Sequence, residues 1–344
     1  MKKRYLYPDI MRTAALLLIF VYHFLIEFSK RIPEVKLPKI FADGGSLSSH
    51  PVAVAVSLFF MVSGASLMLS AREESALSFY RRRFLTILIP FYIVFVLGFI
   101  GTLLVFPERY AGVPVWTILL SVIGMDGYLL EVIPNFYVTG EWFLGCLILL
   151  YLCFPFLKQC VDRKPVLTAA VTMVLFVLLL AFFHAPLFAS RDRYFFLRLP
   201  EFMCGMYLTK YLSAKHRFIY GGIGLALCGL LFVSVLPEDW ELLQRLLITA
   251  GIFLVCRCIG ECLEGKVRFL EDIFHGFASV SYEFFLLHHF LILLAAVFLS
   301  SRELHGGWQN WVLTGLLIIG LLAAAFLHSL PERVGKIMKK RKSA

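Results

Sequence analysis

Long apolar runs recur from one end of this chain to the other, and they limit what it can fold into more than any other feature. Hydrophobic residues make up 60% of its 344 residues, and the mean hydropathy is +0.82. A soluble protein of this length needs far more polar surface. Runs of about 20 apolar residues cross a bilayer as helices, whereas a β-barrel shows short alternating segments. The sequence therefore predicts an all-α, polytopic membrane protein.

Ten stretches are long and apolar enough to be transmembrane helices. They cover residues 11–29, 51–70, 84–106, 141–158, 165–184, 195–212, 217–236, 243–259, 277–300 and 311–330. The stretch 115–130 is shorter and is interrupted by two glycines and Asp126. We expect it to be re-entrant or to lie at the outer surface instead of crossing. Residues 1–344 then form a single integral-membrane domain.

The distribution of basic residues sets the expected orientation. With ten crossings, most of the basic loops fall on the same side as both termini. These loops are residues 72–83, 158–164, 210–217 and 257–268. The positive-inside rule makes that side the cytoplasm, so residues 331–344 are expected to form a basic cytoplasmic tail. The basic loop 30–50 is an exception, because this topology places it outside.

The net charge of +10 does not indicate a nucleic-acid site. The basic residues gather in short loops and near the ends, where orientation charges and contacts with anionic lipid belong. Most of the eight cysteines lie inside apolar runs, where thiols behave as small apolar groups. Cys256, Cys258 and Cys262 are close together, but their spacing fits no zinc pattern. We therefore expect no nucleic-acid partner and no metal site.

The first apolar run contains Arg12 and, eleven residues later, His23. At about 100° per residue, the two side chains lie within roughly 20° of each other on one helix face, with His23 about 16 Å deeper. Asp9 lies near the same face and could pair with Arg12. Ionisable groups at this depth are costly in lipid, so they normally face a protein interior or a wet cavity. This pattern indicates a long anionic ligand whose reactive end is inserted to the level of His23.

Two further clusters of charged residues are candidates for ligand contacts. Arg81, Arg82 and Arg83 precede the third span, where they are either orientation charges or ligands for phosphate groups. Glu141 and Trp142 open the fourth span at the outer side. Trp142 is most simply an interfacial anchor, and Glu141 could hold a hydroxylated acceptor.

Polar residues of the sixth and ninth spans complete the set of candidates. Arg198 and Glu201 are three residues apart, which favours a structural ion pair. Ser281 and His288 are seven residues apart and share a helix face. His288 is either a hydrogen-bonded structural residue or a catalytic one, and the neighbouring His289 is expected to point elsewhere.

Taken together and in this order, these motifs resemble the membrane-bound acyltransferase-3 family over nearly the whole chain. The resemblance rests on a first-helix arginine followed after ten residues by histidine (Arg12 and His23), on the element Phe59-Phe60-Met61-Val62-Ser63-Gly64, and on the helix that begins Trp142-Phe143-Leu144. It also rests on two later motifs, which are Pro200-Glu201-Phe202 and Ser281-Tyr282 with His288. One departure concerns the family's two arginines spaced three apart, because Arg83 matches the first and Thr86 stands at the second.

The resemblance implies a bacterial cytoplasmic-membrane enzyme that transfers an acyl group, most commonly acetyl from acetyl-CoA, to a hydroxyl of a cell-envelope or exported glycan. It implies His23 as general base, Asp9 and Arg12 as its catalytic partners, and the arginines 12, 81, 82 and 83 as ligands of the donor. Glu141, Trp142, Glu201, Ser281 and His288 are then expected to contact the acceptor. No tightly bound cofactor is expected, since acyl-CoA acts as a substrate.

Two other classes of protein fit parts of the sequence. A transporter or flippase of a glycan or lipid-linked substrate is also apolar and basic at its cytoplasmic edge, but it usually shows an internal repeat, and none is visible. A non-catalytic membrane scaffold has no use for Asp9, Arg12 and His23 in lipid. The sequence identifies neither the acceptor nor the oligomeric state.

Overall fold

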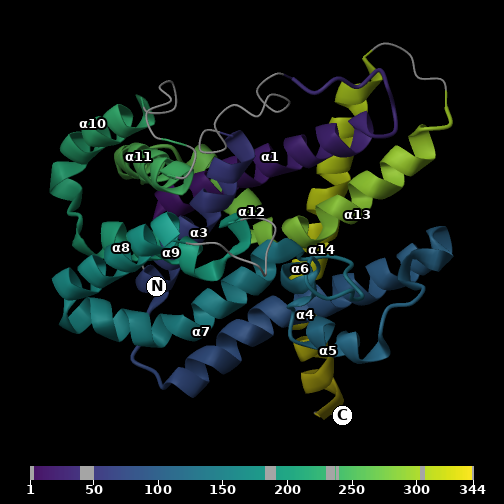
Figure 1. Ribbon diagram of the computed structural model, residues 1–344, viewed down its shortest axis with the longest axis horizontal. Helices are drawn as coiled ribbons and strands as arrows, with labels where there is room; N and C mark the ends of the chain where they lie inside the picture. The colour runs from purple at the N-terminus through teal and green to yellow at the C-terminus, as the bar shows by residue number, and fades with distance from the viewer. Residues whose placement is uncertain are drawn as a thin grey trace.

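The computed structural model describes residues 4–38, 50–182, 191–229, 237, 240–302 and 307–342, with only the backbone of residues 141, 192 and 331–342. Within these residues the secondary structure is entirely helical, which confirms the predicted all-α class. In Figure 1, α1 (Leu6–Ser29) and α3 (Pro51–Ser70) lie in the middle. Helices α8 to α11 gather on one side of them, and α13 and α14 on the other.

The remaining helices follow the order of the apolar runs. They are α4 (Ala76–Val105), α7 (Glu141–Arg163), α8 (Pro165–Phe182), α9 (Phe195–Tyr211), α10 (Arg217–Cys228), α11 (Glu241–Leu263), α12 (Arg268–Ser279), α13 (Ser281–Leu299) and α14 (Trp308–Lys342). Eight helices are long and apolar enough to cross a membrane: α1, α3, α4, α7, α8, α11, α13 and α14. The chain is therefore a multi-pass membrane protein.

Two of the ten expected spans are shorter than those eight helices. Helix α9 has 17 residues and α10 has 12. Helix α10 was expected to extend to residue 236, and residues 230–236 lie outside the described part of the chain. The expected span 277–300 begins later, at Ser281, because residues 268–279 form the separate helix α12.

Helices α3 and α9 cross at two glycines that face each other's backbone. A Cβ atom at Gly205 would lie 1.8 Å from the carbonyl oxygen of Met61, and one at Gly64 would lie 2.0 Å from the carbonyl oxygen of Phe202. Small residues allow such close approach between transmembrane helices. Helix α1 packs against α3, α11, α12 and α13, so its side chains reach the centre of the bundle.

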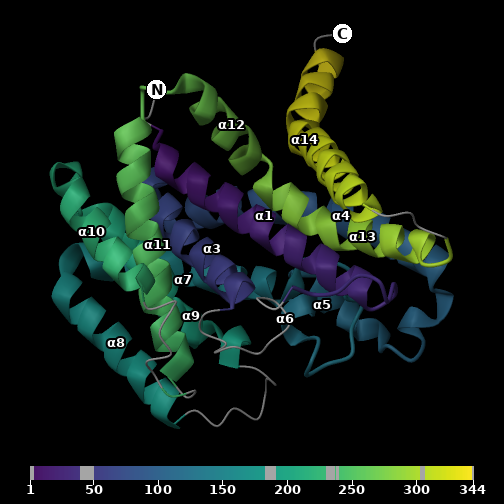
Figure 2. The ribbon, with the colours of Figure 1, turned by 90° about the horizontal axis from the view of Figure 1, so that it is seen from above.

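Two segments between the long helices consist of shorter helices. Residues 115–130 fold into three short helices, at Val115–Thr117, Ile118–Val122 and Asp126–Leu129, with a turn at Gly124 whose φ is +69°. None of the three is long enough to span a bilayer. Helix α12 lies beside the first half of α1 (Figure 2), with Phe269 and Ile273 exposed.

Candidate active site

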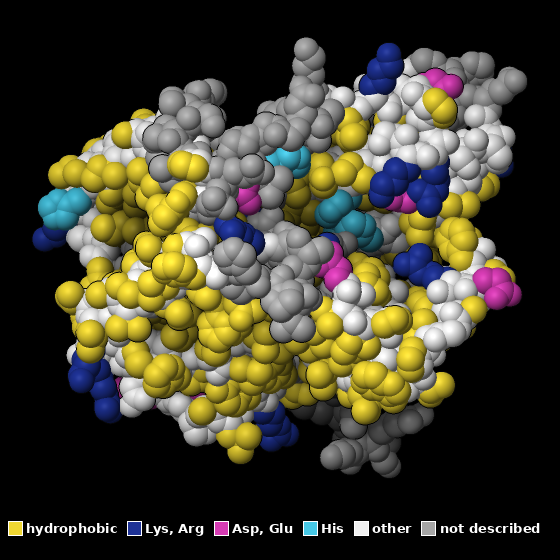
Figure 3. All heavy atoms as spheres, viewed as in Figure 1, with side chains coloured by type: hydrophobic (Ala, Val, Ile, Leu, Met, Phe, Trp, Pro, Cys, Tyr) yellow, Lys and Arg dark blue, Asp and Glu magenta, His cyan; other side chains and the backbone are white. Residues whose placement is uncertain are grey.

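A cavity of about 540 Å³ lies inside the bundle and contains several of the residues selected from the sequence. Its polar lining consists of Arg12, Tyr22, His23, His50, Ser63, Arg83, Thr86, Trp142, Tyr151, Arg193, Arg198, Arg245, Ser279, Ser281, Tyr282, Glu283 and His328. Figure 3 shows one largely hydrophobic face of the molecule, with basic and histidine side chains gathered near its centre. Five arginines and one glutamate are among the described residues that line the cavity, so basic side chains predominate there.

One end of the cavity is marked by Arg12 and Arg83, from α1 and α4. Arg12 donates to Ser66 Oγ at 2.7 Å, and Arg83 donates to Ser70 Oγ at 2.6 Å. Both serines lie in the last turns of α3, so one helix positions both guanidinium groups. Tyr151 of α7 lines the same cavity and interacts electrostatically with both arginines.

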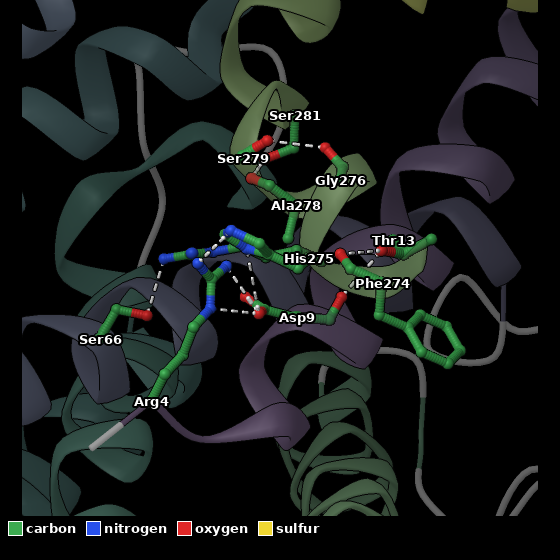
Figure 4. Close-up of polar contacts among 11 residues, drawn as sticks. Arg4, Asp9, Thr13, Ser66, Phe274, His275, Gly276, Ala278, Ser279 and Ser281 are labelled. Carbon is green, nitrogen blue, oxygen red and sulfur yellow. Dashed lines mark hydrogen bonds and ion pairs between the residues drawn. The ribbon is translucent and has the colours of Figure 1, made fainter. Parts of the chain in front are cut away.

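Asp9 forms its ion pair with a different arginine from the one suggested by the sequence. Its Oδ2 atom lies 2.7 Å from Arg4, and Arg4 also donates to His275 Nε2 at 2.8 Å (Figure 4). Asp9 therefore connects the start of α1 to α12, whereas Arg12 reaches α3. Arg4 stands just before the apolar run, and its pairing with a residue five positions away follows no helix spacing.

The three consecutive arginines point in different directions. Arg83 lines the cavity, Arg82 forms a hydrogen bond and ion pair with Glu74, and Arg81 is exposed. The hydrogen bond from Arg82 holds the pKa of Glu74 below its usual range. Thr86, at the position of the family's second arginine, also lines the cavity. Only Arg83 of the three is thus placed next to the cavity.

His23 and His288 form a hydrogen-bonded pair. His23 Nδ1 lies 3.0 Å from His288 Nε2, and His288 Nδ1 lies 2.6 Å from the carbonyl oxygen of Phe285. A carbonyl oxygen only accepts, so Nδ1 of His288 carries the proton. In neutral His288 the Nε2 atom is then an acceptor, and His23 must donate to it from Nδ1. This network leaves the lone pair of neutral His23 on Nε2, the atom that can accept a proton.

His289 lies close to this pair, contrary to the sequence prediction that it points elsewhere. Its ring centroid is 4.0 Å from that of His23. The prediction was wrong because the position on α13 alone does not show that α1 packs across both histidines. Ligand atoms of the three histidines all lie within 4.8 Å of one another, a set that could hold a metal ion. Imidazole nitrogens suit zinc and similar metals, but a metal here would compete with the proton held between His23 and His288.

The opposite end of the cavity lies around Trp142, at the start of α7. The guanidinium carbon of Arg198 lies 5.8 Å from the centre of the Trp142 ring. Arg198 donates to Glu201 at 2.7 Å and to Ser57 Oγ at 3.2 Å, which confirms the ion pair expected from their spacing. Glu201 is buried beneath Arg198 and is not among the residues that line the cavity. The side chain of Glu141 lies outside the described residues.

The first turn of α13 brings two more residues to the cavity, Ser281, which the sequence analysis selected, and Glu283. Ser281 lines it and donates to the carbonyl oxygen of Ala278 at 2.9 Å. Glu283, two residues later, lies 2.9 Å from Nδ1 of His328 on α14. The sequence analysis did not select Glu283, His328 or His50, because their partners are distant in the sequence and no helix spacing connects them.

Arg193 and Arg245 are two more residues of the cavity that the sequence analysis missed. Arg245 lies inside an apolar run and is 0% exposed. An arginine within a transmembrane segment is a functional signal in its own right, and this rule would have found it. Arg193 lies in a short helix before α9, where an arginine carries no such signal.

The order of these motifs along the chain, and the cavity in which they meet, agree with the comparison to known proteins. The profile of a family described as an acyltransferase domain matches residues 5–330. This chain belongs to the acyltransferase-3 family. It is also 24% identical over 314 residues to the acyltransferase MdmB of Streptomyces mycarofaciens, an alignment that covers 81% of this chain and 80% of that protein. No solved structure matches the chain.

Membership of the acyltransferase-3 family confirms the resemblance found in the sequence. It makes this chain a membrane acyltransferase and disfavours the transporter interpretation. The family match also covers both groups of cavity residues, those around Arg12 and those around Trp142.

Proposed function

We propose that this protein transfers an acyl group, most commonly acetyl, from cytoplasmic acyl-CoA to a hydroxyl of an exported or cell-envelope glycan. The observation that carries the proposal is the His23–His288 pair in the same cavity as Arg12 and Arg83. Eleven residues of α1 separate Arg12 from His23, a rise of about 16 Å. A long, nearly neutral pantetheine arm fits between a phosphate site at one end and a thioester site at the other.

The proposed orientation places Arg12 and Arg83 toward the cytoplasm, where acyl-CoA is found. Helices α9 and α10 would complete ten crossings, and both termini would be cytoplasmic. In Figure 2, the start of α1 and the end of α14 lie toward the same edge of the molecule, which supports this orientation. Guanidinium groups bind phosphate through paired hydrogen bonds, so the nucleotide end of the donor would remain there.

In the proposed reaction, Nε2 of neutral His23 takes the proton of the acceptor hydroxyl while the hydroxyl oxygen attacks the thioester carbonyl carbon. The carbon–sulfur bond then breaks, and the proton passes from His23 to the thiolate of CoA. The products are the acyl ester and free CoA. His288 does not react: its Nε2 atom accepts a hydrogen bond from the Nδ1–H group of His23 and so fixes the tautomer of His23. The apolar bundle limits access of water, which reduces hydrolysis of the thioester.

The proposal is tested with inverted membrane vesicles, in which the cytoplasmic face is accessible to added radiolabelled acetyl-CoA. We expect the wild-type protein to label glycans of the vesicles and His23→Ala to lose about 10²–10⁴-fold of that rate. His216→Ala is the matched control, since His216 is exposed and outside the cavity. Wild-type labelling by the His23→Ala protein would refute the general-base role.

Binding of the donor is measured separately on purified protein. We expect CoA to raise the melting temperature, because a ligand that binds the folded state stabilises it. The His23→Ala protein should keep this response, since His23 is placed at the thioester end. A protein that CoA does not stabilise at any concentration would contradict the donor assignment.

A further inference from the structure

The cavity contains three arginines that the proposed reaction does not use, Arg193, Arg198 and Arg245, and Arg198 lies beside Trp142. All three line the cavity. Arg198 and Arg245 are 1% and 0% exposed, so they contact neither bulk water nor lipid headgroups. Charged side chains within membrane proteins are costly and mark substrate or ion sites. We call these three residues the arginine cluster.

The arginine cluster is separate from the arginines assigned to the donor. Trp142 lies beside Arg198, whereas Tyr151 interacts with Arg12 and Arg83. Trp142 and Tyr151 are nine residues apart on α7, which corresponds to a rise of about 13 Å. The cavity therefore has two cationic ends, and one CoA molecule with its phosphates at Arg12 and Arg83 leaves the arginine cluster to another ligand.

Each arginine of the cluster is held by a carboxylate. The pairs are Arg193 with Glu131 at 2.9 Å, Arg198 with Glu201 at 2.7 Å, and Arg245 with Glu241 at 3.9 Å. Among the described residues that line the cavity, none of these three carboxylates is included. The carboxylates thus orient the arginines from positions outside the cavity lining, whereas the three arginines belong to it.

Helix orientation adds positive potential at the same place. The first turns of α3 and α7 supply Val52 and Trp142 to the cavity, and α9 and α11 supply Arg198 and Arg245 from near their starts. Four helices thus contribute residues from their first two turns to the cavity. An N-terminus carries about half a positive charge and favours anions. This arrangement favours an anionic sugar over a neutral one.

We propose that the arginine cluster binds an acidic group of the acceptor, so that the acceptor is an anionic sugar bearing a carboxylate or a phosphate. The inference rests on the proposed function only in identifying the bound anion as the acceptor. The acidic group would be held beside Trp142, and a hydroxyl of the same molecule would reach His23 in the same cavity. The cluster then selects acidic glycans over neutral ones.

The test measures binding of small sugars to the purified full chain in discs of phosphatidylcholine, with CoA present, by thermal stabilisation. Glucuronate and glucose 6-phosphate are compared with glucose, which has an uncharged hydroxymethyl group where they carry the carboxylate or the phosphate ester. We expect at least one of the two anions to bind and to bind more tightly than glucose. We expect Arg193→Gln to weaken that binding about tenfold or more, since a charge-assisted hydrogen bond is lost.

Three further proteins complete the experiment. Arg245→Gln should weaken binding of the acidic sugar as Arg193→Gln does. If the buried substitution Arg245→Gln prevents folding, Arg193→Gln still provides the test, because Arg193 is partly exposed. Arg302→Gln is the matched control, because Arg302 is exposed and outside the cavity. Arg83→Gln should weaken stabilisation by CoA but not by the acidic sugar.

The outcomes separate this inference from the proposed function. The inference is overturned if neither anion binds more tightly than glucose. It is also overturned if Arg193→Gln binds the anion as tightly as the wild-type protein does. An equal loss of CoA binding in Arg193→Gln also overturns it, because the cluster then belongs to the donor. Another outcome is that the acidic sugar binds, its binding depends on Arg193, and CoA does not bind. The inference then stands, and the assignment of acyl-CoA as the donor is wrong. Whichever anion binds more tightly identifies the acidic group as carboxylate or phosphate.

Discussion

A single carbonyl oxygen decides which nitrogen of His23 is basic. Phe285 holds the proton on Nδ1 of His288, and the remaining lone pair of His288 then accepts from Nδ1 of His23. Without this partner, neutral His23 can place its proton on either nitrogen, and its ring can rotate. The proposed reaction needs the lone pair on Nε2, so His288 acts as a positioning residue.

We therefore expect His288→Ala to lower kcat about 10²-fold, as a misplaced catalytic group does, with the KM for acetyl-CoA unchanged. His288→Gln should recover part of the rate, because the glutamine Oε1 atom can take the place of Nε2 as an acceptor. The measurement is steady-state transfer in inverted vesicles. A loss of kcat that glutamine does not relieve at all would indicate a purely structural role for His288.

The arginines of the 81–83 run should differ in their effect on donor binding. Arg83 lines the cavity and is oriented by Ser70, whereas Arg81 is exposed. We expect Arg83→Gln to raise the KM for acetyl-CoA about tenfold or more, the loss expected for a hydrogen bond between charged groups. Arg81→Gln is the matched control and should leave the KM unchanged. Equal effects of the two substitutions would place the phosphates outside the cavity.

At the scale of helices, the crossing of α3 and α9 depends on the absence of a side chain. A Cβ at Gly205 would overlap the backbone of Met61, which cannot move without shifting all of α3. We expect Gly205→Ala to destabilise the protein by about 1–3 kcal/mol or more. Gly222→Ala, on α10, meets nothing within 4 Å and should be neutral or slightly stabilising. Unfolding of both proteins by heat in detergent tests this, and equal melting temperatures would contradict it.

The short segment around Asp126 should make stability depend on pH. Burial raises the pKa of Asp126 from 3.8 to about 6, although Gly127 donates to its Oδ1 atom at 3.1 Å. The folded protein thus prefers the protonated carboxyl. The contribution of Asp126 to the free energy of unfolding is full below pH 4, falls as the pH rises from about 4 to about 6, and is constant above that. The difference between the two pKa values corresponds to about 3 kcal/mol.

Asp126→Asn removes this titration, so it should raise the melting temperature at pH 7.5 and have little effect at pH 4. Melting curves of both proteins between pH 4 and pH 8 provide the measurement. A wild-type protein whose stability rises from pH 4 to pH 6, with Asp126→Asn following the same curve, would show that the carboxyl does not titrate as described.

The helices were predictable from the sequence to the extent that length and hydropathy define them. The apolar run at residues 51–70 corresponds directly to α3. Helix α12 was not expected, because it is a short amphipathic helix next to an apolar run, and only its last residues, 277–279, fell within the predicted span 277–300. Helix α1 begins at Leu6, earlier than predicted, since Asp9 and Arg12 find partners inside the protein.

At the scale of the whole molecule, the site could be predicted only where its residues share one helix. The spacing of Arg12 and His23 placed both on one face of α1, and both line the cavity. The partner of His23 lies 265 positions away, and the partner of Arg12 lies 54 positions away. Such pairs depend on which helices pack together, and hydropathy carries no information about that. For the same reason the sequence did not connect Arg193 with Arg245.

The proposed topology requires both termini to share the side on which the donor enters. Arg12 lies near the start of α1, and Arg83 lies near the start of α4, so both helices must begin in the cytoplasm for acyl-CoA to reach them. Ten crossings then return the end of α14 to the cytoplasm, where its basic residues agree with the positive-inside rule.

We expect green fluorescent protein fused after Ala344 to fluoresce, and alkaline phosphatase at the same position to be inactive, because each reporter works on only one side of the membrane. Fusions after Arg302, between α13 and α14, should show the reverse pattern. The reversal is essential, since α14 is long enough to cross once and the two positions must lie on opposite sides. Active phosphatase at the C-terminus would imply an odd number of crossings or an inverted chain. An inverted chain would place Arg12 and Arg83 outside the cell, where no acyl-CoA could reach them.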